Sequence, residues 1–138
     1  METFVHITDR PITEHPFPSI PGGAAGAWIQ FHGIVRPEES GRVITALDYE
    51  AYPPMAETQI RQIVADLATR WPCLAMRVVH RIGIVPVGEA AIVVTVAARH
   101  RAEAFGLLAE FMDRLKQDVP IWKRRALEQE QTETRTPS

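Results

Sequence analysis

Two lysines near the C-terminal end of the sequence are the residues whose type and spacing first point to chemistry. Lys116 and Lys123 stand in the stretch LKQDVPIWKRR, with a proline and a tryptophan between them. Seven residues apart on one helix they would share a face, but Pro120 removes a backbone donor and biases Val119 away from helical geometry. We therefore predict a helix that ends near Asp118, with Lys116 in its last turn and Lys123 on the segment that leaves it.

Three further cations fall at the ends of expected elements. Arg36 follows a predicted strand, and His100 and Arg101 stand between a predicted strand and the last predicted helix. Loops and element ends commonly carry function because a rigid scaffold aims them. The start of a helix also favours an anion, so a phosphate is a natural ligand for His100 and Arg101. The alternative for each cation alone is a solvated surface group.

The hydrophobic pattern supplies the elements that must position these residues. Alternating or continuous apolar runs predict strands, and apolar residues at helical spacing predict two amphipathic helices. The predicted strands are 4–8, 27–35, 43–52, 75–82 and 90–98, and the predicted helices are 53–71 and 102–115. This order indicates an α+β domain with a mixed or antiparallel sheet.

Three of these strands carry a specific expectation. Residues 90–98 (AAIVVTVAA) are apolar on both faces, which predicts a central strand. Residues 27–35 and 43–52 are separated by the polar loop PEESGR, and we expect them to pair as a hairpin.

The chain is expected to form one domain over residues 1–125, with an irregular connection at 9–26. Gly22, Gly23 and Gly26 lie in that connection and lack the pattern of a phosphate loop, so we interpret them as a linker. Residues 126–138 form a polar tail, and disorder is expected beyond about residue 127.

The composition excludes several classes of function. A net charge of −2 and a pI near 6.2 argue against nucleic-acid binding. The longest apolar run is too short to span a bilayer, and the first residues lack the layout of a signal peptide, so a cytoplasmic protein without a membrane partner is expected. The only cysteine, Cys73, is interpreted as a packing residue. The five histidines form no close pair, so no metal site is predicted.

Five motifs taken together are more specific than any of the cations alone. They occur in this order: FHGIVR (31–36), LDYEAYPPMAE (47–57), HRIG with VGE (80–83 and 87–89), ARHRAEAF (98–105) and LKQDVPIWKRR (115–125). Over residues 25–125, the sequence resembles the large, catalytic subunit of molybdopterin synthase.

That resemblance implies an α/β-hammerhead type of fold and a sulfurtransferase in molybdenum cofactor biosynthesis. The family converts cyclic pyranopterin monophosphate into molybdopterin by inserting two sulfurs as a dithiolene. The sulfur arrives as a thiocarboxylate at the Gly-Gly C-terminus of a small ubiquitin-like carrier subunit. The resemblance also implies a central homodimer within a heterotetramer, a pocket that borrows residues across the dimer, and no bound cofactor.

The resemblance also implies roles for the residues singled out above. Lys116 and Lys123 would lie at the reacting centre, and Arg36, His100 and Arg101 would contact the phosphate and polar edge of the pterin. The neighbouring residues implied as further substrate contacts are Ile34, Val35, Arg124 and Arg125.

Other residues of these motifs have a plainer interpretation. We interpret Phe31, Met112 and Trp122 as core or pocket wall. His80 and Arg81 lie on a predicted strand among valines, and we interpret them as structural.

Two positions depart from the family pattern. The family usually has an acidic residue two positions after the second lysine, where this chain has Arg125, and the polar tail lacks the family's aromatic closing segment. Two alternatives to the enzyme stay open. Arg125 is the main argument for a non-catalytic paralogue that serves as an adaptor for a ubiquitin-like protein, and the other alternative is a phosphate-binding module that uses only His100 and Arg101.

Overall fold

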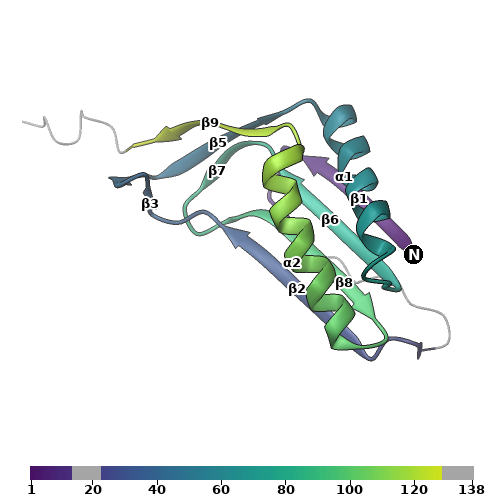
Figure 1. Ribbon diagram of the computed structural model, residues 1–138. Helices are drawn as coiled ribbons and strands as arrows, with labels where there is room; N and C mark the ends of the chain where they lie inside the picture. The colour runs from purple at the N-terminus through teal and green to yellow at the C-terminus, as the bar shows by residue number, and fades with distance from the viewer. Residues whose placement is uncertain (14–22, 129–138) are drawn as a thin grey trace, which may run out of the picture.

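The computed structural model describes residues 1–13 and 23–128, and it has the α+β architecture that the sequence predicts (Figure 1). Two helices and two main sheets form a single domain. In chain order the elements are β1 (Glu2–Thr8), β2 (Ala27–Ile34), β3 (Glu38–Glu39), β4 (Arg42–Val43), β5 (Ala46–Ala51), α1 (Pro53–Ala68), β6 (Ala75–Arg81), β7 (Gly83–Pro86), β8 (Ala90–Ala98), α2 (Arg101–Asp118) and β9 (Ile121–Leu127).

The larger sheet has four strands in the order β1-β6-β8-β2. The β1–β6 pair is parallel and the other two pairs are antiparallel. β8 lies inside the sheet, as its apolar run predicts. Both helices cover one face of this sheet (Figure 1). The main core fills the space between them and is centred on the fully buried Ile60, Leu67, Val94, Leu107 and Phe111.

The smaller sheet has three strands in the order β7-β5-β9 and extends beyond the C-terminal end of α2 (Figure 1). All of its pairings are antiparallel. It has a separate small core, which consists of Val35, Ile44, Leu47, Val85 and Ala91. The short strands β3 and β4 form a hairpin of their own before β5.

The predicted hairpin between residues 27–35 and 43–52 is wrong. β2 pairs with β8, and β5 pairs with β7 and β9. The polar loop between them forms the β3–β4 hairpin, in which Ser40 and Gly41 have positive φ values of 52° and 79°. Because that loop folds on itself, the chain passes from the large sheet to the small one without the two long strands meeting.

Both predicted helices are present, and α2 ends at Asp118 as the proline predicts. Val119 is extended, with φ −96° and ψ 130°, and its N–H still donates to the carbonyl of Leu115 at 3.2 Å. The chain turns there and starts β9 at Ile121. The turn places Lys116 and Lys123 on two different elements that meet at one corner.

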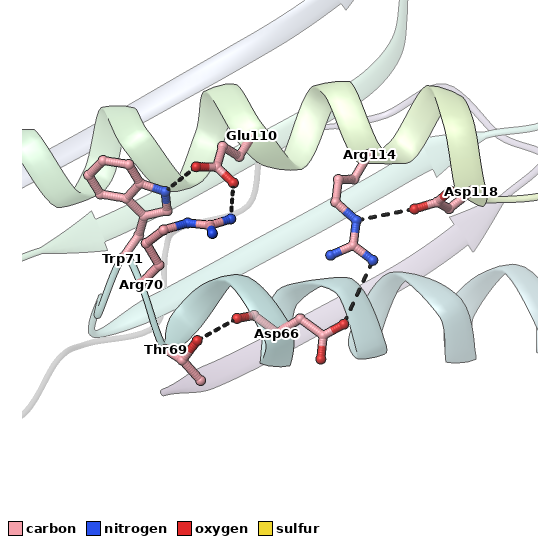
Figure 2. Close-up of polar contacts among 7 residues, drawn as sticks. All are labelled: Asp66, Thr69, Arg70, Trp71, Glu110, Arg114 and Asp118. Carbon is pink, nitrogen blue, oxygen red and sulfur yellow. Dashed lines mark hydrogen bonds and ion pairs between the residues drawn. The ribbon is translucent and has the colours of Figure 1, made fainter.

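A polar seam holds the two helices together (Figure 2). Nε1 of Trp71, which follows α1, donates to Glu110 of α2 at 2.9 Å, and Arg70 pairs with the same carboxylate. Farther along α2, Arg114 bonds Asp118 at 3.1 Å and pairs with Asp66 of α1 at 3.7 Å. The seam follows α2 almost to Lys116, so it fixes the helix from which that lysine projects.

Three sequence predictions concern the polar tail, the irregular connection at residues 9–26 and the absence of a membrane span. β9 includes Ala126 and Leu127, and the tail residues 129–138 lie outside the described residues. Of the expected irregular connection, residues 9–13 and 24–26 are described without a helix or strand, and residues 14–22 lie outside the described part. Neither helix in the described ranges is long and apolar enough to cross a membrane.

Candidate functional site

A cavity of about 500 Å³ lies where the two sheets meet the C-terminal end of α2. Its walls come from β2, β5, β6, β8, α2 and β9. The apolar part of the lining is Phe31, Ile34, Ala91, Ile92, Met112, Leu115 and Ile121, and the other part is His32, Gly33, Arg36, Tyr49, His80, Lys116 and Lys123. A hollow that combines apolar walls with convergent polar groups is a common form of a small-molecule site.

Three cations converge on this cavity from separate elements. Arg36 follows β2, Lys116 lies in the last turn of α2, and Lys123 lies on β9. The sequence contains only these two lysines, and both line the same cavity. Within the described residues, Arg36 and Lys116 form no ion pair, so their charge is open to an anionic ligand.

A bulge in the strand pairing decides which cations of β9 reach the cavity. Tyr49 of β5 lies opposite Lys123, whereas its neighbour Asp48 lies opposite Arg125, so Arg124 is the extra residue. Consecutive residues of a strand point to opposite faces of the sheet. Lys123 therefore shares the cavity face with Tyr49, and Arg125 shares the other face with Asp48. Bulges often redirect a side chain in this way beside an active site.

Arg124 and Arg125 consequently do not line the cavity, although both were predicted as substrate contacts. Nε of Arg125 donates to the carboxylate of Asp48 at 3.2 Å, and the Asp48 side chain is 10% exposed. Arg124 is exposed at the bulge. Arg125 thus neutralises a buried carboxylate on the far face of the small sheet.

The predicted contacts Ile34 and Val35 have different surroundings. Ile34 lines the cavity, next to a second irregularity in pairing, between Gly33 and Ile34. Val35 is buried in the small core, and its backbone N–H and C=O bond Glu89 and Gly88 at 3.0 and 2.9 Å. The Val35 side chain is therefore a packing group that holds Arg36 in place.

His100 and Arg101 lie at the opposite end of α2 from Lys116. Arg101 and Lys116 are fifteen positions apart on the helix, which corresponds to about 22 Å along the axis. One chain alone therefore does not bring His100 and Arg101 to its own cavity. Their role as pterin contacts stays a prediction, and it depends on the second copy that the resemblance implies.

His80 was interpreted as structural, yet it lies in the cavity wall. The ring is buried, and its Nδ1 bonds the carbonyl of Arg81 at 2.8 Å. Since a carbonyl only accepts, Nδ1 carries the proton and Nε2 is left as an acceptor. Burial lowers the pKa of His80 to about 4, against a smaller raising effect of that hydrogen bond, so the ring is neutral at physiological pH.

Tyr49 and Glu39 are two further residues that the sequence did not single out. The Tyr49 ring meets the His80 ring edge-on, with centroids 5.4 Å apart. Burial, together with the negative charge of Glu39, raises the pKa of Tyr49 above its usual value. Glu39 itself pairs with Lys123, its two oxygens lying 3.2 and 3.4 Å from Nζ. No local signal marks this pair because 84 residues separate the partners.

Cys73 packs against the edge of the main core. Burial and, to a lesser degree, Glu103 raise the pKa of its thiol to about 11, which keeps it protonated and poorly nucleophilic at neutral pH. Across residues 1–13 and 23–128, no three His, Cys, Asp or Glu side chains gather to hold a metal ion.

Comparison with known proteins identifies the family. The model of the family described as "MoaE protein" matches residues 7–118. The chain belongs to the MoaE protein family. It is 40% identical over 125 residues to the molybdopterin synthase catalytic subunit of Bacillus subtilis, covering 90% of this chain and 79% of that protein.

Two further MoaE relatives define how far this likeness extends. The chain is 41% identical over 107 residues to the human molybdopterin synthase catalytic subunit, covering 78% of this chain and only 57% of the human protein. The crystal structure of molybdopterin synthase from Staphylococcus aureus superposes with a TM-score of 0.77 at 31% identity, covering 90% of this chain and 95% of that one. The fold of the MoaE family is thus present nearly in full.

Proposed function

We propose that this chain is the catalytic subunit of a molybdopterin synthase. It transfers sulfur from the C-terminal thiocarboxylate of a small ubiquitin-like subunit to cyclic pyranopterin monophosphate, and the product carries the dithiolene of molybdopterin. The observation that carries this proposal is the convergence of Arg36, Lys116 and Lys123 on one cavity. Membership of the MoaE family supplies the reaction.

The charges of the cavity suit the two proposed reactants. A phosphate ester and a thiocarboxylate are both anions, and their mutual repulsion opposes the encounter unless cations lie nearby. Arg36 offers a planar guanidinium that can bind phosphate oxygens in a fork. The two lysines offer point charges on flexible stems at the place where the reactants meet. The apolar part of the lining lowers the local dielectric around bound reactants and so strengthens each of these interactions.

The two lysines take distinct roles in this proposal. Lys116 orients or transiently engages the carbonyl of the thiocarboxylate. Lys123 stabilises charge or transfers a proton on the pterin. Their separate elements support this division, because Lys116 projects from the helix end and Lys123 from β9. A protein nucleophile is unnecessary, since the carrier subunit brings the sulfur.

We further propose that two copies of the chain form the centre of a heterotetramer. In this arrangement His100 and Arg101 of a second copy complete the cavity that one chain leaves open. Both residues are exposed at the start of α2, so they are accessible to another chain. They would contact the phosphate and the polar edge of the pterin.

The adaptor alternative is less well supported. Its sequence argument was Arg125, which stands where the family has an acid. The pairing of Arg125 with the buried Asp48 gives this residue a structural role on the face away from the cavity. Arg125 therefore does not argue against catalysis at the lysines.

The experiment that tests the function is a reconstitution. The purified chain is mixed with a thiocarboxylated small subunit and cyclic pyranopterin monophosphate, and molybdopterin is assayed. A carrier ending in an ordinary carboxylate serves as the matched control. Product only with the thiocarboxylate supports the enzyme. Carrier binding without product supports the adaptor, and pterin binding without any protein partner supports the phosphate-binding module.

A further inference from the structure

The β3–β4 hairpin, residues 37–44, is joined to β9 by two ion pairs of opposite polarity. Glu39 of the hairpin pairs with Lys123, and Arg42 of the hairpin pairs with Glu128 at 3.2 Å. Within the described residues, no other side-chain hydrogen bond or ion pair links this hairpin to the remainder of the chain. The buried Ile44 anchors the base of the hairpin in the small core, and surface electrostatic contacts dock its two arms on the strand that carries a cavity lysine.

These contacts are weak enough to exchange partners. Side-chain exposures are 52% for Lys123 and 26% for Glu39, and 75% for Arg42 and 41% for Glu128. Exposed ion pairs contribute roughly 0–1 kcal/mol each because water screens the charges and the long side chains lose freedom. The turn of the hairpin, Ser40-Gly41, has the two positive φ values that suit a tight two-residue turn. The hairpin can thus keep its own shape while its docking contacts open.

The partner of Lys123 has the chemistry of the proposed reactant. Glu39 presents a carboxylate with both oxygens within 3.4 Å of Nζ. A chain ending in a carboxylate or thiocarboxylate presents the same charge and nearly the same two-atom geometry. An ammonium can donate to either, but the two anions repel each other at one lysine.

We propose that Glu39 is a positioning residue that holds Lys123 at the cavity before the carrier binds, and that the carboxylate or thiocarboxylate end of the incoming carrier replaces it. This inference rests on the function proposed above and adds an earlier step, in which Lys123 receives the end of the carrier before it acts on the pterin. The incoming group binds Lys123 in preference to Glu39 because it also contacts Arg36 and Lys116 inside the cavity, whereas Glu39 contacts only Lys123, from the rim. Glu39 then moves away from Lys123 with the arms of the hairpin, while the buried Ile44 keeps its base in the small core.

The first test uses the free protein and does not depend on catalysis. Lys123 and Lys116 are the only lysines, so their acetylation by acetic anhydride can be followed separately by peptide mass spectrometry, with Lys116 as the internal reference. Glu39→Gln removes the carboxylate and keeps the side-chain size. We expect Lys123 to be labelled about 2- to 5-fold faster in this variant, as loss of a surface ion pair allows. Glu38→Gln, an exposed neighbour on the same strand, is the matched control and should leave the rate unchanged.

The second test measures the competition. The probes are a synthetic peptide ending in Gly-Gly with a free carboxylate and the same peptide with a C-terminal amide. We expect Glu39→Gln to bind the carboxylate peptide about 2- to 5-fold more tightly than the parent and the amide peptide equally well. Glu39→Asp, which keeps the charge, should restore the parent affinity. In the reconstituted enzyme, Glu39→Gln should lower KM for the carrier with little change in kcat.

The outcomes separate this inference from the proposed function. If Lys123 labelling is the same in Glu39→Gln and the parent, the inference is overturned whether or not the protein makes molybdopterin. If Glu39→Gln binds the carboxylate peptide more weakly than the parent does, or gains the same affinity for the amide peptide, then Glu39 does not compete with the end of the carrier. If the labelling changes as expected while neither peptide binds any variant, the carrier-replacement step is overturned, and reconstitution then decides the function by itself.

Discussion

The indole of Trp71 lies against the backbone of Gly106, in the space that a side chain at position 106 would need. A Cβ built on Gly106 would lie 2.5 Å from Cδ2 and from Cζ3 of the ring. The same indole donates to Glu110, one turn farther along α2 (Figure 2). The glycine thus allows the end of α1 to approach α2 closely enough for the polar seam to form.

Gly106→Ala tests this close approach. Alanine in a helix is favoured over glycine by up to about 1 kcal/mol, so an isolated helix would gain. Here the clash with a rigid indole outweighs that gain, and we expect a net loss of about 1–3 kcal/mol in the free energy of unfolding. Urea unfolding of the purified variant measures it.

A double-mutant cycle distinguishes the clash from other causes. In a Trp71→Leu background the indole is absent, and Gly106→Ala should then be neutral or stabilising. If Gly106→Ala lowers the free energy of unfolding equally in both backgrounds, a clash with Trp71 does not explain why alanine is unfavourable at this position.

His80 makes the stability depend on pH in a defined window. Burial lowers its pKa to about 4 in the folded chain, against 6.5 in the unfolded chain. The unfolded state therefore takes up a proton as pH falls below about 6.5, and the folded state does so only near 4. Stability is lost across that window, by about 2 kcal/mol between pH 7 and about pH 4.5.

His80→Asn isolates this contribution. The asparagine amide can still donate to a nearby carbonyl but does not titrate in this range. All other ionisable groups are shared by the two proteins, so their contributions cancel in the comparison. The difference in urea-unfolding free energy between the two proteins should therefore narrow on acidification by about 2 kcal/mol. Parallel curves would show that His80 is not held neutral.

How far the sequence predicts this fold depends on whether the signal is local. The end of α2 followed from Pro120, and the interior position of β8 followed from a run that is apolar on both faces. Both are properties of consecutive residues. The strand β9 was missed because five consecutive residues, Trp122 to Ala126, are exposed, so its sequence lacks the alternation of a half-buried strand.

The cavity was predicted only in part for the same reason. Ile34, Arg36, Lys116 and Lys123 were anticipated and do line it. The pairing of Glu39 with Lys123 and the bulge that turns Arg125 away depend on contacts between distant strands, which no local pattern encodes. His80 resembled an ordinary strand histidine because its cavity is formed by other elements.

Arg125 tests the assignment of the two faces of β9. Arg125→Gln removes the partner of Asp48, and we expect a loss of about 1 kcal/mol in unfolding free energy. Arg125→Glu, the acid that the family resemblance suggests, also places a like charge beside a nearly buried carboxylate. We expect it to cost about 2–3 kcal/mol.

Arg124→Glu is the matched control for that series. This neighbouring residue is exposed and, within the described part of the chain, forms no ion pair. The same charge change there should alter stability by no more than about 0.5 kcal/mol. Equal losses at positions 124 and 125 would contradict the specific pairing with Asp48.

Lys116 is the sharper of the two lysines for testing catalysis, because no described residue pairs with it. Lys116→Ala removes the ammonium from the end of a helix that the polar seam and a buried apolar face hold in place. We expect the free energy of unfolding to change by no more than about 0.5 kcal/mol and molybdopterin formation to fall by roughly 100-fold or more. The measurement is single-turnover product formation with a thiocarboxylated carrier, beside urea unfolding of the same preparation. Gln117→Ala, the next exposed position on α2, should retain full turnover. Full turnover in Lys116→Ala would remove this lysine from the reacting centre, whereas a loss of both stability and turnover would assign it to the scaffold.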